Sequence, residues 1–229
     1  MNQKIGTQEY AVVSAADQPM HEGDQFIAGL RNRRRPRVFI ISGPSGVGKD
    51  SVIDRLRERE SDTHFAVTAT TRPRRETEID GMHYHFLSEQ RFAEWIADAE
   101  FIEFATVYGR RYGVPKSPIR AALERGQDVV IKIDVQGAAS VRALLPESVG
   151  IFIAPESMHS LRLRLSARKT DDPAALARRF EEAGRELLRA HEFDYIVFNE
   201  TNGLLRTVDE ISAIIQAVRA EIRQPDITI

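Results

Sequence analysis

Apolar residues along the chain gather in short continuous runs that alternate with longer amphipathic stretches. Four runs have the length and composition of buried strands, at residues 38–41, 128–134, 150–154 and 195–198. A helical stretch follows the first run at about residues 51–58, and amphipathic helices separate the other runs. Continuous apolar strands separated by helices indicate a parallel sheet with helices on both faces, which binds ligands at the carboxyl ends of its strands. The predicted fold class is therefore α/β.

Two stretches depart from this rhythm. Residues 1–35 show no sustained apolar period and end in a basic run, and we interpret them as a flexible N-terminal extension without an assigned role. Residues 68–115 are richer in Arg, Tyr and Glu and contain only short strand-like pieces. We predict that they form a subdomain inserted into a main domain at residues 36–225.

A glycine-rich turn follows the first predicted strand and opens a helix, which is the context that a phosphate-binding loop (P-loop) requires. Its backbone N–H groups can surround one phosphate, and Lys49 can reach the outer phosphates of a nucleotide. The usual pattern has Ser or Thr after the lysine, whereas this chain has Asp50. A glycine-rich turn that binds no nucleotide is the alternative. The residues predicted to bind ATP here are Gly43, Pro44, Ser45, Gly46, Val47, Gly48, Lys49, Asp50 and Ser51.

Composition and charge exclude several other classes of site. The chain has 32 Lys and Arg against 34 Asp and Glu, a balance that gives no reason to expect a nucleic-acid or membrane surface. It has no cysteine, which excludes disulfides, thiolate zinc sites and cysteine nucleophiles. No apolar run approaches the ~20 residues of a membrane helix, and no apolar signal core is present near the N-terminus. We therefore expect a cytoplasmic location.

Several separated blocks of the chain resemble guanylate kinases in order and spacing over nearly all of residues 38–220. The first block, residues 67–75, is followed by Tyr84, and in the family this block holds the phosphate of GMP. The resemblance implies this role for Arg72, Arg75 and Tyr84, and it agrees with the match between guanidinium groups and phosphate oxygens. Taken alone, the block could also be an arginine-rich turn on a solvated surface.

The second block, residues 100–115, resembles the guanine pocket of the family. Glu103 would accept hydrogen bonds from guanine N1 and from its exocyclic amine, a pair of donors that adenine does not present. Tyr112 would join the phosphate contacts, and Thr68 takes the place of a small hydroxyl residue near the base. Many family members have Ser or Thr where this chain has Val114. In isolation Glu103 could equally be an ordinary surface acid.

Two further blocks concern the metal ion and the ATP phosphates. Asp134 ends a predicted strand and would hold the water molecules around Mg²⁺, together with Asp50, and would also take part in the GMP site. The resemblance implies a helical lid at residues 166–182, in which Arg168 and Arg179 close over the ATP phosphates. Asn199, after the last predicted strand, would lie near the edge of the ATP site. Lys49 and the two lid arginines are the candidate catalytic residues.

The resemblance implies a P-loop NTPase fold and the Mg²⁺-dependent phosphorylation of GMP, and of dGMP, by ATP in purine nucleotide metabolism. Three alternatives are weighed, of which a nucleic-acid-binding protein that uses the basic N-terminal run is disfavoured by the balanced net charge. Ribose 1,5-bisphosphate phosphokinases share the fold and can have Asp after the P-loop lysine, but they would not need Glu103. Guanylate-kinase-like binding modules of scaffold proteins are not catalytic and usually have a degraded P-loop, whereas Lys49 is intact here. The oligomeric state stays open.

Two departures from the family pattern lead to a structural prediction. Asp50 replaces the hydroxyl residue of the P-loop, and Lys132 stands where the family usually has an acid, two places before Asp134. The residues around Lys132 are apolar, so an unpaired ammonium group there would be costly. We predict that Asp50 and Lys132 form an ion pair.

Overall fold

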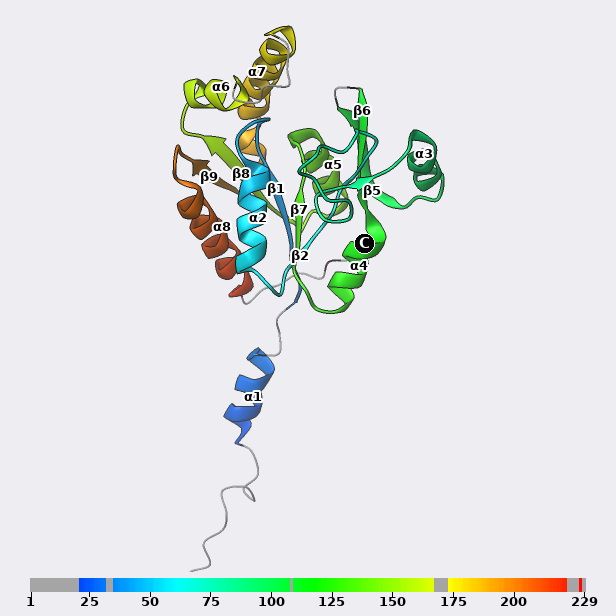
Figure 1. Ribbon diagram of the computed structural model, residues 1–229. Helices are drawn as coiled ribbons and strands as arrows, with labels where there is room; N and C mark the ends of the chain where they lie inside the picture. Colours follow the sequence, from blue (N-terminus) through cyan, green and yellow to red (C-terminus); the bar gives the residue numbers. More distant parts are fainter. Residues whose placement is uncertain (1–20, 32–34, 108, 167–172, 222–226, 228–229) are drawn as a thin grey trace, which may run out of the picture. The chain divides into compact units, whose positions relative to one another are not determined.

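The computed structural model describes residues 21–31, 35–107, 109–166, 173–221 and 227 (Figure 1). The chain divides into two units, Met1–Arg34 and Arg35–Ile229. In the first unit the structure contains helix α1 (Glu22–Arg31), which the sequence pattern did not predict. Its apolar side chains Phe26, Ile27 and Leu30 are exposed. All remaining elements belong to the second unit.

The central sheet has five parallel strands in the order β2-β7-β1-β8-β9. All four predicted strands are present in it. The structure adds the short edge strand β2, whose two residues were too few to produce a pattern. The bounds are β1 (Val38–Ser42), β2 (His64–Phe65), β7 (Val129–Lys132), β8 (Val149–Pro155) and β9 (Tyr195–Asn199).

Helices cover both faces of this sheet because its buried strands send alternate apolar side chains to opposite sides. Phe39 and Ile41 of β1 pack in one buried cluster with α2 (Lys49–Arg59) and α8 (Leu204–Arg219). Val38 and Ile40 pack in a second cluster with α4 (Lys116–Glu124) and α5 (Val135–Leu144), on the opposite side in Figure 1. The predicted α/β class with two helical layers is confirmed.

A second sheet lies beside the central one, in the order β4-β3-β6-β5. It has its own aromatic core, in which Phe92 and Phe101 stack with ring centroids 4.6 Å apart and Trp95 packs alongside. Its antiparallel pairs separate it from the βα rhythm of the rest of the chain. Its elements are β3 (Ala69–Thr70), β4 (His85–Phe86), α3 (Glu89–Ala97), β5 (Phe101–Val107) and β6 (Arg110–Pro115).

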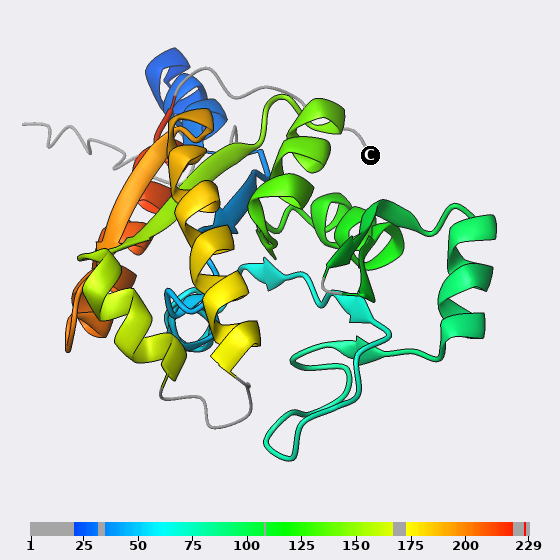
Figure 2. The same ribbon diagram turned by 90° about the horizontal axis from the view of Figure 1, so that it is seen from above.

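Two helices pack against each other, and one of them lies toward the second sheet. Figure 2 shows α7 (Pro173–Leu188) between α6 (Met158–Ser166) and the second sheet. A short 3₁₀ helix (Ala190–Glu192) then leads into β9. In the part of the chain that the structure describes, no helix is both long and apolar enough to cross a membrane.

Candidate functional site

A cleft of about 550 Å³ opens where the P-loop, the second sheet and α7 meet. It lies at the carboxyl ends of β1 and β7, where a parallel sheet is expected to bind its ligands. Residues predicted for three different roles therefore share one cavity. The predicted site residues in its lining are Ser45, Gly46, Gly48, Lys49, Asp50, Thr68, Arg72, Arg75, Tyr84, Tyr112, Asp134 and Arg179.

The other predicted site residues stand outside that lining. Arg168 lies outside the described residues. Asn199 is buried behind the P-loop, where its side-chain amide donates a hydrogen bond of 2.7 Å to the carbonyl oxygen of Val47. Arg164 donates to the same carbonyl and to that of Asn199, at 3.0 and 2.8 Å. These two side chains therefore brace the loop. The remaining predicted residues outside the lining are Gly43, Pro44, Val47, Ser51 and Glu103.

The glycines of the P-loop are required by its backbone. Gly43 has φ of 143°, and a Cβ atom there would lie 2.2 Å from the carbonyl oxygen of Ile153. Gly48 has φ of 103°, and its Cβ would lie 2.6 Å from the side-chain nitrogen of Asn199. Both positions exclude ordinary side chains, by conformation and by space. The loop is thus held in one curled shape against β8 and β9.

Charged side chains converge on the mouth of this loop. The ammonium group of Lys49 donates to the carbonyl oxygens of Gly43 and Pro44, the latter at 3.2 Å. The backbone N–H of Ser45 donates to the carboxylate of Glu186 at 2.9 Å, and Arg179 donates to the Ser45 hydroxyl at 3.0 Å. The loop thus already binds one carboxylate group, as its exposed N–H groups and positive charge favour.

Burial shifts the pKa values of both charged groups at the loop. It lowers the pKa of the Lys49 ammonium group, although the nearby carboxylates of Glu186 and Asp50 act in the opposite direction. Burial raises the pKa of Glu186, and the charge of Lys49 offsets part of this shift. Both groups are therefore more easily neutralised than in water.

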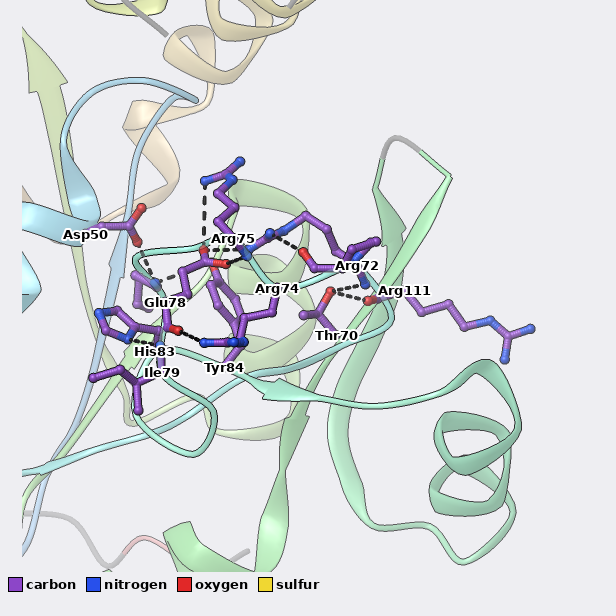
Figure 3. A network of polar contacts seen from close by, with 12 residues as sticks. Asp50, Thr70, Arg72, Arg74, Arg75, Glu78, Ile79, His83, Tyr84 and Arg111 are labelled. Atoms are coloured by element: carbon purple, nitrogen blue, oxygen red, sulfur yellow. Dashed lines mark hydrogen bonds and ion pairs between the residues drawn. The ribbon is translucent and has the colours of Figure 1, made fainter. Parts of the chain in front are cut away.

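A second cluster of cations lies in the turn before β4, around the carboxylate of Glu78 (Figure 3). Arg72 pairs with Glu78 at 2.7 Å, and the backbone N–H of Arg75 donates to the same carboxylate at 2.8 Å. The Arg75 guanidinium group lies 3.9 Å from it. Burial alone would raise the pKa of Glu78, but the hydrogen bonds from Arg72 and Arg75 hold it below its usual value. Glu78 thus stays ionised and fixes both arginines at the cleft.

The predicted ion pair between Asp50 and Lys132 is present. The Lys132 ammonium group lies 2.6 Å from an Asp50 carboxylate oxygen, and 3.4 Å from the hydroxyl group of Tyr84. Lys132 ends β7 on the face that packs against α2, which begins with Lys49 and Asp50. Strand alternation and the start of the P-loop helix therefore bring the two charges together.

Glu103 reaches the start of α5, close to Asp134. The Asp134 carboxylate caps that helix by accepting a hydrogen bond of 2.8 Å from the backbone N–H of Gly137. A Cβ atom on Gly137 would lie 3.1 Å from the Glu103 carboxylate. Burial, with a smaller contribution from the charge of Asp134, raises the pKa of Glu103 to about 7. Val114 pairs with Glu103 across the second sheet and is fully buried.

The donor groups of the cleft suit a hard divalent cation that is held together with phosphates. Asp50 and Asp134 present carboxylate oxygens to the same cavity, and Mg²⁺ is usually bound by one or two carboxylates plus substrate oxygens and water. Among the described residues there is no group of three or more acidic, histidine or cysteine side chains that would hold a metal alone. The residues therefore fit a metal that arrives with the nucleotide.

Sequence reasoning missed two carboxylates of the site. Glu186 lies seven residues after Arg179, a spacing that places both on one face of α7 and that was a usable signal. Glu78 follows Arg75 by three residues, but nothing in the local sequence indicates that it orients the arginines. Its role depends on how the turn folds back on itself.

Comparisons with known proteins agree with this geometry. The model of the guanylate kinase family matches residues 35–218. The chain is 41% identical over 85% of its length to guanylate kinase 2, chloroplastic/mitochondrial, of Oryza sativa, covering 69% of that protein. It is 43% identical over 80% of its length to the guanylate kinase of Gloeobacter violaceus, covering 84% of it. The crystal structure of guanylate kinase from Anaplasma phagocytophilum superposes with a TM-score of 0.69 at 30% identity, covering 82% of this chain and 88% of that one.

Proposed function

This chain belongs to the guanylate kinase family, and we propose that it transfers the γ-phosphate of ATP to GMP with the residues of the cleft in the roles given below. One observation supports these roles above all. The P-loop, which follows a strand of the central sheet, and Arg72, which follows a strand of the second sheet, line the same cavity. A donor phosphate on the first and an acceptor phosphate on the second would therefore face each other.

The P-loop is the proposed donor site. Its backbone N–H groups and the N-terminus of α2 would bind the β- and γ-phosphates of ATP. The ammonium group of Lys49, which now donates to the carbonyl groups of its own loop, would turn toward the γ-phosphate. The phosphates would also displace the Glu186 carboxylate from the Ser45 N–H. The phosphates would thus take the place of an anion that the loop already binds.

The second sheet carries the proposed acceptor site. Arg72 and Arg75 would bind the GMP phosphate through their guanidinium groups, with Tyr84 and Tyr112 adding hydroxyl donors. Glu103 would accept hydrogen bonds from the guanine ring, with Thr68 and Asp134 nearby. Because dGMP differs from GMP only in the ribose, these contacts apply to both substrates.

The transfer needs little covalent chemistry from the protein. An ionised oxygen of the GMP phosphate forms a bond to the γ-phosphorus of ATP, and the bond between that phosphorus and the β,γ-bridging oxygen breaks, giving GDP and ADP. The acceptor oxygen is already ionised at neutral pH, so no general base is required. Positioning and charge neutralisation by Lys49, Arg179 and Arg168 are the proposed catalytic contributions.

Phosphoryl transfer of this kind needs a divalent metal. We propose Mg²⁺, held by Asp50 and Asp134 through water, which would neutralise charge on the phosphates. Residues 166–182 are the proposed lid. The hydrogen bond from Arg179 to the Ser45 hydroxyl group of the P-loop supports this assignment.

The comparisons do not favour a ribose 1,5-bisphosphate phosphokinase or a non-catalytic binding module. The relatives described above are all named guanylate kinases, and the matches cover 69%, 84% and 88% of their lengths. None of the three is named as a ribose bisphosphate kinase or a scaffold module. An ADP-release assay that offers GMP, dGMP, AMP and ribose 1,5-bisphosphate separately tests the assignment. We expect turnover with GMP and dGMP alone. Turnover of ribose 1,5-bisphosphate without turnover of GMP would contradict it.

A cytoplasmic location is also a proposal. The rice relative is named for chloroplasts and mitochondria, whereas the bacterial relative is named without a compartment. Fractionation of the source cells followed by immunodetection would test the location directly.

A further inference from the structure

The ring of Tyr84 is flanked by two cations in the cleft. The guanidinium carbon of Arg72 lies 5.4 Å from the ring centroid, and the ammonium nitrogen of Lys132 lies 4.7 Å from it. Lys132 also lies within 3.4 Å of the Tyr84 hydroxyl group. Arg72 and Tyr84 are proposed ligands of the acceptor phosphate, so Lys132 adds a third cationic or donor group to the same place.

Lys132 is largely buried and belongs to the lining of the cleft. Its side chain is only 16% exposed, and its ammonium group lies 2.6 Å from the Asp50 carboxylate. A paired carboxylate of this kind offsets the cost of burying a positive charge.

The way in which Lys132 is held resembles the way in which the arginines are held. Glu78 orients Arg72 and Arg75 by ion pairs and a backbone hydrogen bond, and Asp50 holds Lys132 by an ion pair of 2.6 Å. An ammonium group has three N–H donors. Within the part of the chain that the structure describes, the Lys132 ammonium group donates to Asp50 and Tyr84, so one donor remains for a ligand in the cleft.

We propose that Lys132 is a further binding residue for the phosphate of the acceptor nucleotide, and that Asp50 is its positioning residue. The proposal rests on the function proposed above and adds a ligand that the family pattern does not supply, because the family usually has an acid at this position. The alternative is a purely structural ion pair that ties α2 to β7. The two differ in what they predict for substrates with and without a phosphate.

Equilibrium binding to the whole chain, without ATP or metal, separates these alternatives. The affinities of GMP and guanosine are measured by calorimetry and by ligand-observed NMR for the unmodified protein and for Lys132→Met, Lys132→Arg and Lys116→Met. We expect Lys132→Met to weaken GMP binding roughly tenfold or more, the usual effect of losing a hydrogen bond to a charged group, and to leave guanosine binding unchanged. Lys132→Arg should recover part of the loss. Lys116→Met, a lysine outside the cleft lining, should change neither affinity.

A second set of variants tests the role given to Asp50. Asp50→Asn should weaken GMP binding less than Lys132→Met does, because the ammonium group remains. The double variant should lose no more than Lys132→Met alone, since Asp50 acts through Lys132 in this site. Losses that multiply would show that Asp50 acts independently and would overturn this part of the proposal.

The remaining outcomes are equally decisive. Unchanged GMP affinity with a lower unfolding temperature would show a structural pair only and overturn the proposal. An equal loss for GMP and guanosine would also overturn it, because the phosphate would not be involved. If Lys132→Met does not fold, Lys132→Gln takes its place in the same comparison. Failure of the unmodified protein to bind GMP would instead contradict the proposed function itself.

Discussion

The two walls of the cleft, the proposed donor and acceptor sides, present their anion-binding groups by different means. On the donor side, the backbone of the P-loop presents its N–H groups, and its glycines at positions 43 and 48 fix the curl through positive φ angles. On the proposed acceptor side, side chains from the turn before β4 carry the charge. Arg72 and Arg75 reach their places because Glu78 holds them.

The main cation of each side therefore has different partners and a different pKa shift. Lys49 donates hydrogen bonds to carbonyl groups of its own loop, and burial lowers the pKa of its ammonium group, so this group is more easily neutralised than in water. The pKa of Arg72 is raised, because its contacts with Glu78 outweigh its burial. We therefore expect the donor side to rearrange on binding, and the acceptor side to bind with Arg72 held as it is by Glu78. Substitutions on the two sides should accordingly change different kinetic constants.

The largest effect is expected from Lys49→Met. Removing the only ammonium group of the P-loop takes away a charge that stabilises the transferring phosphate, so kcat should fall by roughly 10²–10³-fold. The KM for GMP should change little, because GMP binds on the other wall. Steady-state ADP release measures both constants, with Lys116→Met as the matched control. A comparable rise in the KM for GMP would mean that the two sides are not separate.

The next effect concerns base recognition by Glu103. Glu103→Gln replaces an acceptor for two guanine donors by an amide, and should lower kcat/KM for GMP by roughly 10- to 150-fold. The charged form makes these contacts, and the pKa of Glu103 is about 7 in the substrate-free protein. The ratio of kcat/KM between the unmodified protein and Glu103→Gln should therefore grow between pH 6 and pH 8. A ratio independent of pH would contradict this role.

The same pKa shift has a consequence for stability. A folded-state pKa of about 7 lies above the value of 4.5 in the unfolded chain, so the folded state binds this proton more tightly. Stability is therefore lost as the pH rises through this interval. Glu103→Gln should raise the unfolding temperature relative to the unmodified protein at pH 8 and not at pH 4. Thermal unfolding at both pH values provides the measurement.

A smaller effect is expected from Glu78→Gln, which sharpens the contrast on the acceptor side. The folded-state pKa of Glu78 is depressed, so its contribution to stability is present above the unfolded pKa and is lost as the pH falls through the folded value. Denaturant unfolding should show a loss of about 1.5–3 kcal/mol at pH 7 that shrinks below about pH 4. The KM for GMP should rise about tenfold, because Arg72 and Arg75 lose their orientation, while the KM for ATP stays constant. Glu94→Gln, an exposed helical carboxylate paired with Arg91, is the matched control.

The contrast between the walls also explains what the sequence could predict. The P-loop is a contiguous motif, and its glycines, its lysine and the strand before it were recognisable from residues 38–50 alone. The central sheet was predictable because buried parallel strands form continuous apolar runs. Of its five strands, only β2 was not predicted, because it has only two residues. Helix α1 was not predicted either, because its large apolar residues Phe26, Ile27 and Leu30 cover little more than one helical turn within a polar extension.

The acceptor wall is assembled from segments that are far apart, so resemblance rather than pattern identified it. Arg72 and Tyr112 come together through the pairing of β3 with β6. The hydrophobic pattern of either segment alone does not predict this pairing. The Asp50–Lys132 pair is the exception, because two departures from one family pattern and strand alternation constrained it. Glu186 was missed because an acid on a charged helix face is common, and its contact with Ser45 spans 141 residues of sequence.

The smallest effect should come from Glu186→Gln, which tests whether the donor wall is held ready by an internal anion. The Glu186 carboxylate accepts a hydrogen bond from the Ser45 N–H and lies in the lining of the cleft, where the ATP phosphates would bring like charge. An amide of the same shape keeps the packing and removes the repulsion, so ATP should bind about threefold more tightly, as expected for a partly screened charge pair. Burial raises the pKa of Glu186, so this advantage should shrink as the pH falls and the carboxyl group of the unmodified protein becomes protonated. Calorimetric titration with ATP at pH 8 and pH 6 measures it, and Glu181→Gln, an exposed neighbour on the same helix, should leave ATP affinity unchanged. Weaker ATP binding by Glu186→Gln would show instead that the carboxylate supports Lys49 in the bound state, and the donor wall would then resemble the acceptor wall in depending on a carboxylate to orient its cation.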